Sequence, residues 1–243
     1  MENWLIGSIL SALSTGIGAL PILFFKNLTH KSRDILLAFT AGVMVSATMF
    51  SLIPEALHTS NMLVVTIGLF LGTLILSLLE RVIPHIDLEH SKQLKNFDEK
   101  ALLIIAAITL HNIPEGLSVG VSYAGGSQDG LGNLIALAIG LQNAPEGLLV
   151  ALFLVHQQVG KVKAFLIATL TGSVEILSGL LGYSLTSLVD NLVPYGLSFA
   201  AGAMLFIVYK ELIPESHGDG HETVSTYSFM VGLITMIFLT QVF

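Results

Sequence analysis

Apolar residues run along the chain in long blocks that short polar connections separate. Blocks of about 20 residues, the length that crosses the hydrocarbon core of a bilayer, recur eight times. Their approximate bounds are 4–25, 34–57, 61–83, 101–123, 131–156, 161–185, 192–213 and 222–243. One long connection, about 84–100, is charged and polar and is expected to be a loop. The pattern predicts an all-α polytopic membrane protein, with a single transmembrane domain over 1–243.

Composition strengthens this prediction. Hydrophobic residues make up 53% of the 243 residues, Asp, Glu, Lys and Arg only 11%, and the mean hydropathy is +0.81, whereas soluble domains carry roughly 25% charged residues. The absence of cysteine excludes disulfides, thiolate zinc sites and iron–sulfur clusters. The net charge of −7 leaves no basic face for phosphates, so we expect no nucleic acid partner. The first 25 residues lack the basic start of a signal peptide, so we expect them to form the first membrane helix.

Basic residues gather in the odd-numbered connections between these blocks. Nine of the ten lie there or at the flanks: Lys26, Lys31, Arg33, Arg81, Lys92, Lys95, Lys100, Lys161 and Lys163. Because Lys and Arg in short loops are retained on the cytoplasmic side, the odd-numbered connections are expected to be cytoplasmic. Both termini are then extracytoplasmic.

An internal repeat marks the centre of the molecule. Setting residue 37 on residue 197 aligns LAFTAGVMVSATMFSLIPE with LSFAAGAMLFIVYKELIPE, so the second and seventh segments are copies. A second alignment, with a shift of 31, sets HNIPEGL at 111–117 on QNAPEGL at 142–148. Each pair runs in opposite directions through the membrane, which indicates an inverted repeat. Such repeats are typical of secondary transporters, whose substrate site lies near the midplane on helices broken by Gly or Pro. Pro114 and Pro145 predict that the fourth and fifth segments are the broken ones.

The repeated motif places possible metal ligands on one helix face. His111 and Glu115 are four residues apart and Asn112 and Glu115 three apart, spacings that bring side chains together. The fifth segment repeats the arrangement with Gln142, Asn143 and Glu146.

Glu175 adds a third carboxylate, in the middle of the sixth apolar segment. Three carboxylates at membrane depth are costly unless they are protonated or paired with a cation, and the simplest cation is a divalent metal. Imidazole, carboxylate and amide donors suit zinc, iron(II), manganese or cobalt, and this reasoning leaves the choice open. If Glu115 and Glu146 point into one cavity, they can bridge two ions. A protonated carboxyl that packs between helices would also explain Glu175 alone.

The sequences HNIPEG, QNAPEG and SVEILSG around Glu175 resemble the motifs of the ZIP (Zrt-, Irt-like) family of divalent metal transporters, in particular its bacterial GufA-like branch. The resemblance covers all eight segments. It implies a 3+2+3 helix arrangement in the plasma membrane, the inner membrane of a bacterium, and commonly a homodimer. It also implies import of zinc, or of the related ions iron, manganese, cadmium or cobalt, toward the cytoplasm. The metal is then a transported substrate, with no cofactor and no enzymatic activity.

By matching positions, the resemblance implies a binuclear metal centre. Its ligands would be His111, Asn112, Glu115, Gln142, Asn143, Glu146 and Glu175. Met44 would be a soft ligand above the centre, although methionines at helical positions are also common packing residues. Asn143 and Gln142 stand where many relatives have Asp or His, so the second ion is expected to bind weakly or transiently. Lys210 stands where relatives often have His.

Polar residues near the cytoplasmic end are candidates for a metal exit path. They are Glu211, His217, Asp219, His221, His85 and His90. A solvated polar loop would explain the histidines and Asp219 equally well. The spacing of Gly68 and Gly72 is typical of a close helix interface and agrees with a dimer.

Two other functions fit some of these residues. An intramembrane metalloenzyme would use the same ligands around an open metal position, but no HExxH motif is present and an enzyme does not explain the inverted repeat. A cation-coupled transporter of an organic solute would use the carboxylates for the coupling ion. The shortage of polar residues that could line a solute pocket argues against it.

Overall fold

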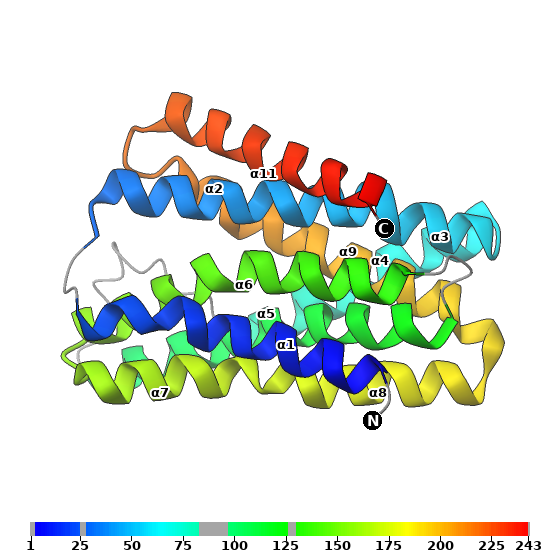
Figure 1. The fold of residues 1–243 in the computed structure, drawn as a ribbon, viewed down its shortest axis with the longest axis horizontal. Helices are drawn as coiled ribbons and strands as arrows, with labels where there is room; N and C mark the ends of the chain where they lie inside the picture. Colours follow the sequence, from blue (N-terminus) through cyan, green and yellow to red (C-terminus); the bar gives the residue numbers. More distant parts are fainter. Residues whose placement is uncertain (1–2, 25–27, 83–96, 126–129, 243) are drawn as a thin grey trace.

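The computed structural model describes residues 3–24, 28–82, 97–125 and 130–242, and every regular element within them is a helix (Figure 1). The long helices are α1 (Asn3–Ala19), α2 (His30–Ala47), α4 (Met62–Val82), α5 (Phe97–Gly125), α6 (Leu131–His156), α7 (Lys161–Gly172), α8 (Val174–Leu188), α9 (Val193–Ile207) and α11 (Glu222–Val242). The short elements are the 3₁₀ turns η1 (Leu20–Leu23) and η3 (Asp190–Leu192), the π-helical segments η2 (Thr48–Leu52) and η4 (Val208–Leu212), and the helices α3 (Ile53–His58) and α10 (Ile213–Ser216). The all-α prediction is confirmed.

Seven stretches of the described chain are long and apolar enough to cross a membrane, and each lies at one of the expected segments. The eighth expected segment corresponds to α5, which lies among the other helices of the bundle (Figure 1). Helix α5 begins at Phe97, inside the range of about 84–100 that was expected to be a loop. Residues 83–96, with the candidate ligands His85 and His90, lie outside the described residues.

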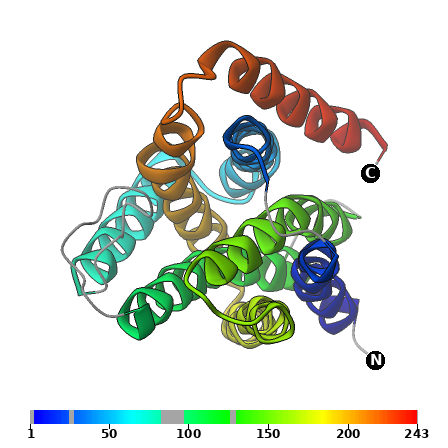
Figure 2. The ribbon, with the colours of Figure 1, turned by 90° about the vertical axis from the view of Figure 1, so that its left-hand side faces the viewer.

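The helices pack as two groups, seen end-on in Figure 2. In one group α2 packs along α11 and α4 along α9, and in the other α1 packs along α6 and α5 along α8. Contacts of α5 with α9 and of α2 with α6 join the groups. Large apolar side chains such as Phe70 of α4 and Phe238 of α11 point outward, 72% and 66% exposed, as lipid-facing positions do. A water-soluble protein rarely exposes so many.

Glycines allow the closest helix contacts, and they occur in matched pairs. A β-carbon at Gly72 of α4 would lie 2.1 Å from the carbonyl oxygen of Phe199 in α9, and one at Gly232 of α11 would lie 2.2 Å from that of Phe39 in α2. The two contacts are related by the same offset that aligns residue 37 with residue 197. Gly68 likewise faces Ser198 of α9. The glycine spacing on α4 therefore serves packing inside one chain rather than a dimer interface.

The same offset relates the irregular parts of the second and seventh spans. The π-helical segments η2 and η4 occupy equivalent positions, and each is followed by a short helix that begins Ile-Pro-Glu. π-Helical turns inside helices occur frequently at functional sites. The repeat found in the sequence is therefore a structural repeat, which includes the places where the helices depart from regularity.

Residues in or beside the first, fifth and seventh connections lie near one another at one end of the bundle. His30 at the start of α2 bonds to Asp219 with Nδ1 to Oδ2 at 3.0 Å, and Lys161 at the start of α7 donates to the carbonyl of Leu23 at 3.1 Å. The guanidinium carbon of Arg33 lies 5.1 Å from the ring centre of Phe153 near the end of α6. The termini of the described chain lie toward the other end (Figure 1).

Candidate metal centre

The motif residues of α5, α6 and α8 meet in the interior of the bundle. Asn112, Glu115, Gln142, Asn143 and Glu175 are each at most 2% exposed. The helices α5 and α6 continue through Pro114 and Pro145, so the prediction that these two are broken is wrong. Proline inside a membrane helix is tolerated where neighbouring helices satisfy the freed backbone groups.

The interruption lies instead in the sixth span, between α7 and α8. The backbone turns at Ser173, whose amide bonds to the carbonyl of Leu170 in a 3₁₀ pattern, and α8 starts again at Val174. Glu175 thereby comes to lie in the first turn of α8, where the helix dipole favours a negative charge.

Amide groups of α6 hold the carboxylates of the neighbouring helices. Gln142 Nε2 donates to Glu115 Oε1 at 2.5 Å, and Asn143 Nδ2 donates to Glu175 Oε1 at 2.7 Å. The two copies of the motif therefore contact each other and the lone glutamate of the sixth span.

Helix α1 also contributes to this cluster, through a residue that the sequence analysis missed. Ser11 Oγ donates to Glu175 Oε2 at 2.5 Å, and Asn143 Nδ2 lies 3.3 Å from the carbonyl oxygen of Ser11. Ser8, Ser11 and Thr15 are all buried. Their spacing of three and four residues, in an otherwise apolar block, was a signal that one polar face of α1 points inward.

The two motif asparagines repeat this contact symmetrically. Asn112 Nδ2 donates to the carbonyl oxygen of Thr171 at 2.8 Å, as Asn143 does to that of Ser11 at 3.3 Å. Ser11 and Thr171 are related by the offset that aligns residue 37 with residue 197. The two asparagines are related by the shift of 31 that aligns the two motifs. The pseudo-symmetry of the fold therefore passes through this cluster.

On the other side of the cluster His111 pairs with Glu211 of η4, with Nε2 to Oε2 at 2.7 Å. Glu146 lies within electrostatic range of both residues, and of Glu115 and Glu175 as well. A row of acidic groups with one imidazole thus extends from α8 across α5 and α6 to the π segment of the seventh span. Glu211, expected only on an exit path, lies directly beside the motif.

Four oxygens of the cluster are buried and accept no hydrogen bond from the described part of the chain: Glu115 Oε2, Gln142 Oε1, Asn143 Oδ1 and Glu146 Oε1. Buried polar atoms are nearly always satisfied. Oxygens of this kind are ligands for divalent cations. Among the described residues, no three His, Asp or Glu side chains are arranged as a ready metal-holding group.

The remaining candidate residues lie on other elements of the chain. Met44 is 1% exposed in the hydrophobic core that also contains Met204. Asp219 and His221 belong to the connection after α10, where His221 Nδ1 bonds to Asp34 Oδ2 at 2.9 Å, and His217 lies in the same connection. Lys210 forms an ion pair with Glu80.

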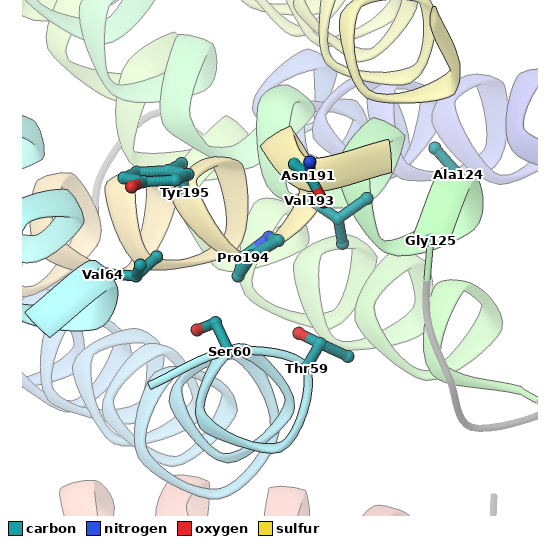
Figure 3. A pocket seen from close by; sticks show the side chains of 9 residues that line it. All are labelled: Thr59, Ser60, Val64, Ala124, Gly125, Asn191, Val193, Pro194 and Tyr195. Atoms are coloured by element: carbon teal, nitrogen blue, oxygen red, sulfur yellow. The ribbon is translucent and has the colours of Figure 1, made fainter. Parts of the chain in front are cut away.

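Two further features can be set apart from the cluster. A hollow of about 450 Å³ opens near the end where α3 and α5 end and α9 begins (Figure 3). Its polar groups, such as Thr59, Ser60 and Asn191, are neutral hydroxyls and amides, which lack the charge to hold a metal.

Residues 116–120, GLSVG, have the GxSxG spacing that surrounds the nucleophile of many hydrolases. They lie within α5, where Ser118 Oγ donates to the carbonyl of Glu115 at 2.6 Å. This serine is therefore not on the exposed strand-to-helix turn of a hydrolase.

Membrane-length helices in an inverted repeat, around buried carboxylates, define a polytopic membrane protein of the transporter class. The family model "ZIP Zinc transporter" matches residues 83–240. "Zinc transporter GufA" of Myxococcus xanthus is 39% identical, over 98% of both chains. "Zinc transporter ZIPB" of Bordetella bronchiseptica is 36% identical, over 96% of this chain and 79% of its own length. A shorter match, 41% identical over 56% of this chain and 42% of the relative, is to human "Zinc transporter ZIP11".

The chain belongs to the ZIP family of divalent metal transporters. The resemblance seen in the motifs is thereby confirmed. Because this is a family of transporters, the chain is not an enzyme, and the intramembrane metalloenzyme is excluded.

Proposed function

We propose that this chain imports zinc toward the cytoplasm through the cluster on α5, α6 and α8. The observation that carries the proposal is the group of buried, unsatisfied oxygens on Glu115, Glu146 and the two amides of α6. A cation among them would satisfy these oxygens and offset the charge of three carboxylates in one step. The names of the relatives, all zinc transporters, agree with zinc as the substrate.

The same donors suit iron(II), manganese, cadmium and cobalt, so the site need not be exclusive for zinc. We propose two ion positions: one near His111, Glu115 and Glu146, the other near Asn143 and Glu175. The second is the weaker, because an amide oxygen supplies no net charge. In this proposal Met44 is a soft ligand beyond the cluster, and Asn112 and Gln142 are oxygen donors within it.

The exit path runs from His111 to Glu211. A small cavity beside this pair is lined by Glu80 and by apolar side chains of α4, α5 and α9. It leads in the direction of the Lys210–Glu80 ion pair. His217, Asp219 and His221, together with His85 and His90, would receive the ion at the cytoplasmic end.

We further propose that the chain is one transmembrane domain in the bacterial inner membrane, with both termini extracytoplasmic and with a homodimer as the working form. The gathering of nine basic residues in odd-numbered connections supports this orientation.

Uptake of metal into proteoliposomes tests the function. The purified protein should move radioactive zinc into vesicles down a gradient, and an excess of cadmium, iron(II) or manganese should compete in an order that defines selectivity. Empty vesicles are the control. If zinc enters at the rate of empty vesicles while an organic solute drives cation entry, the coupled solute transporter is the correct alternative.

A further inference from the structure

Helix α1 contacts the candidate metal centre through Ser11. Its hydroxyl holds one oxygen of Glu175, and the amide of Asn143 holds the other. Asn143 Nδ2 also lies 3.4 Å from Ser11 Oγ. Ser11, Asn143 and Glu175 therefore form a closed triangle of contacts between α1, α6 and α8. All three side chains are at most 1% exposed.

The symmetry of the fold shows what is special about this serine. At the equivalent position of the other repeat, the carbonyl of Thr171 accepts from Asn112, as that of Ser11 accepts from Asn143. The hydroxyl of Thr171, however, bonds back to the carbonyl of Ala168 within its own helix at 2.8 Å. The hydroxyl of Ser11, by contrast, donates to a carboxylate on another helix. The two halves of the cluster thus differ at this contact.

We propose that Ser11 is a positioning residue for the metal-binding carboxylate of Glu175. This inference rests on the proposed function, since it assigns α1 a part in the same site. A hydroxyl that holds one carboxylate oxygen fixes the direction of the other, and partners of this kind commonly change metal affinity by about 10–100-fold when they are removed. Ser11 does not itself bind the metal. It sets the affinity of the Glu175 half of the site.

Ser8 offers a matched control on the same helix. It lies one turn earlier and is as deeply buried as Ser11, and its hydroxyl has no hydrogen-bond partner in the described part of the chain. Ser8→Ala therefore removes the same atom from the same helix without touching Glu175.

The experiment measures zinc affinity by calorimetry on purified protein, and the zinc concentration for half-maximal uptake in proteoliposomes. Ser11→Ala should lower the zinc affinity, and raise the half-maximal zinc concentration, by about tenfold. Ser8→Ala should stay within about twofold of wild type in both measurements. Ser11→Thr, which keeps the hydroxyl, should retain most of the affinity. If Ser11→Ala yields no folded protein, Ser11→Val compared with Ser11→Thr gives the same contrast between near-isosteric side chains. The proposal is overturned if Ser11→Ala and Ser8→Ala bind zinc with equal affinity. It is likewise overturned if Ser11→Val and Ser11→Thr do.

A double-mutant cycle separates positioning from general packing. In the Glu175→Gln background, Ser11→Ala should cause no further loss of zinc affinity, because the hydroxyl acts through the carboxylate. A full tenfold loss in that background would assign Ser11 to packing. Failure of the proposed site itself would be a different result, in which Glu175→Gln and Glu115→Gln bind zinc as wild type does, whatever Ser11 contributes.

Discussion

At the scale of single residues, the cluster is built so that neutral donors lie between acidic acceptors. Gln142 and Asn143 present nitrogen to Glu115 and Glu175, while their own oxygens accept no hydrogen bond from any residue that the structure describes. A carboxamide that rotates by half a turn exchanges nitrogen for oxygen in nearly the same place. The amides can therefore satisfy the carboxylates at one time and bind a cation beside them at another.

Replacing Asn143 with aspartate tests this role of the amide. Asn143→Asp removes the donor to Glu175 and sets two carboxylates face to face, which is unfavourable unless a cation lies between them. The melting temperature without added metal should fall, zinc should raise it by more than in wild type, and the number of zinc ions bound per chain should increase.

Thermal unfolding with and without zinc, together with metal analysis of the purified protein, measures these quantities. Asn133→Asp is a suitable control, because Asn133 bonds to Tyr123 outside the cluster. An unchanged zinc stoichiometry and an unchanged response to zinc would show that Asn143 does not face the metal.

At the scale of helices, the sequence predicted the elements well and their irregularities poorly. The blocks of apolar residues located the spans because bilayer thickness fixes their length. The prolines of α5 and α6 did not break these helices, because packing against neighbouring helices outweighs the local tendency of proline to break a helix. The real interruptions, at Ser173 and in η2 and η4, depend on contacts between distant segments, which no single window of sequence contains.

The same distinction holds for the site. The residues on α5, α6 and α8 could be predicted because a carboxylate in an apolar segment is conspicuous. Ser11 was missed because a serine in a membrane helix is common, and only the fold brings it to Glu175. Glu211 was expected farther away, because the sequence does not show that η4 turns it toward His111.

A glycine substitution tests the packing of one helix pair. Gly72→Ala would place a β-carbon 2.1 Å from the carbonyl oxygen of Phe199, and overpacking of this kind costs about 1–3 kcal/mol. The melting temperature in detergent should fall, while the oligomeric state stays that of wild type, because Gly72 packs within one chain. Gly160→Ala, whose added carbon meets nothing within 4 Å, is the control. If Gly72→Ala instead dissociates into monomers without losing stability, the glycine spacing on α4 belongs to a dimer interface.

At the scale of the whole molecule, the fold joins two inverted halves around the cluster. At one end of the molecule, His30 and Asp34 of α2 bond to the connection after α10, and Lys161 at the start of α7 bonds to Leu23 of η1. The charge of this end sets the expected orientation.

Cysteine labelling tests that orientation, since the chain has no cysteine of its own. Single cysteines at Lys92 and Gly218, in odd-numbered connections, should be protected from an impermeant thiol reagent in intact cells and become labelled after permeabilisation. A cysteine at Asn191, in an even-numbered connection, should be labelled in intact cells because it lies on the opposite side. The reverse pattern would contradict the proposed import direction as well as the orientation.

The central claim is that zinc crosses the membrane through the carboxylates of α5 and α6. The most direct measurement is zinc uptake by proteoliposomes containing the double variant Glu115→Gln and Glu146→Gln, beside wild type and the exposed control Glu222→Gln. The double variant keeps the shape of both side chains but removes both charges, so uptake should fall to the level of empty vesicles while Glu222→Gln transports normally. Uptake by the folded double variant at the rate of wild type would contradict this account and place the metal path elsewhere.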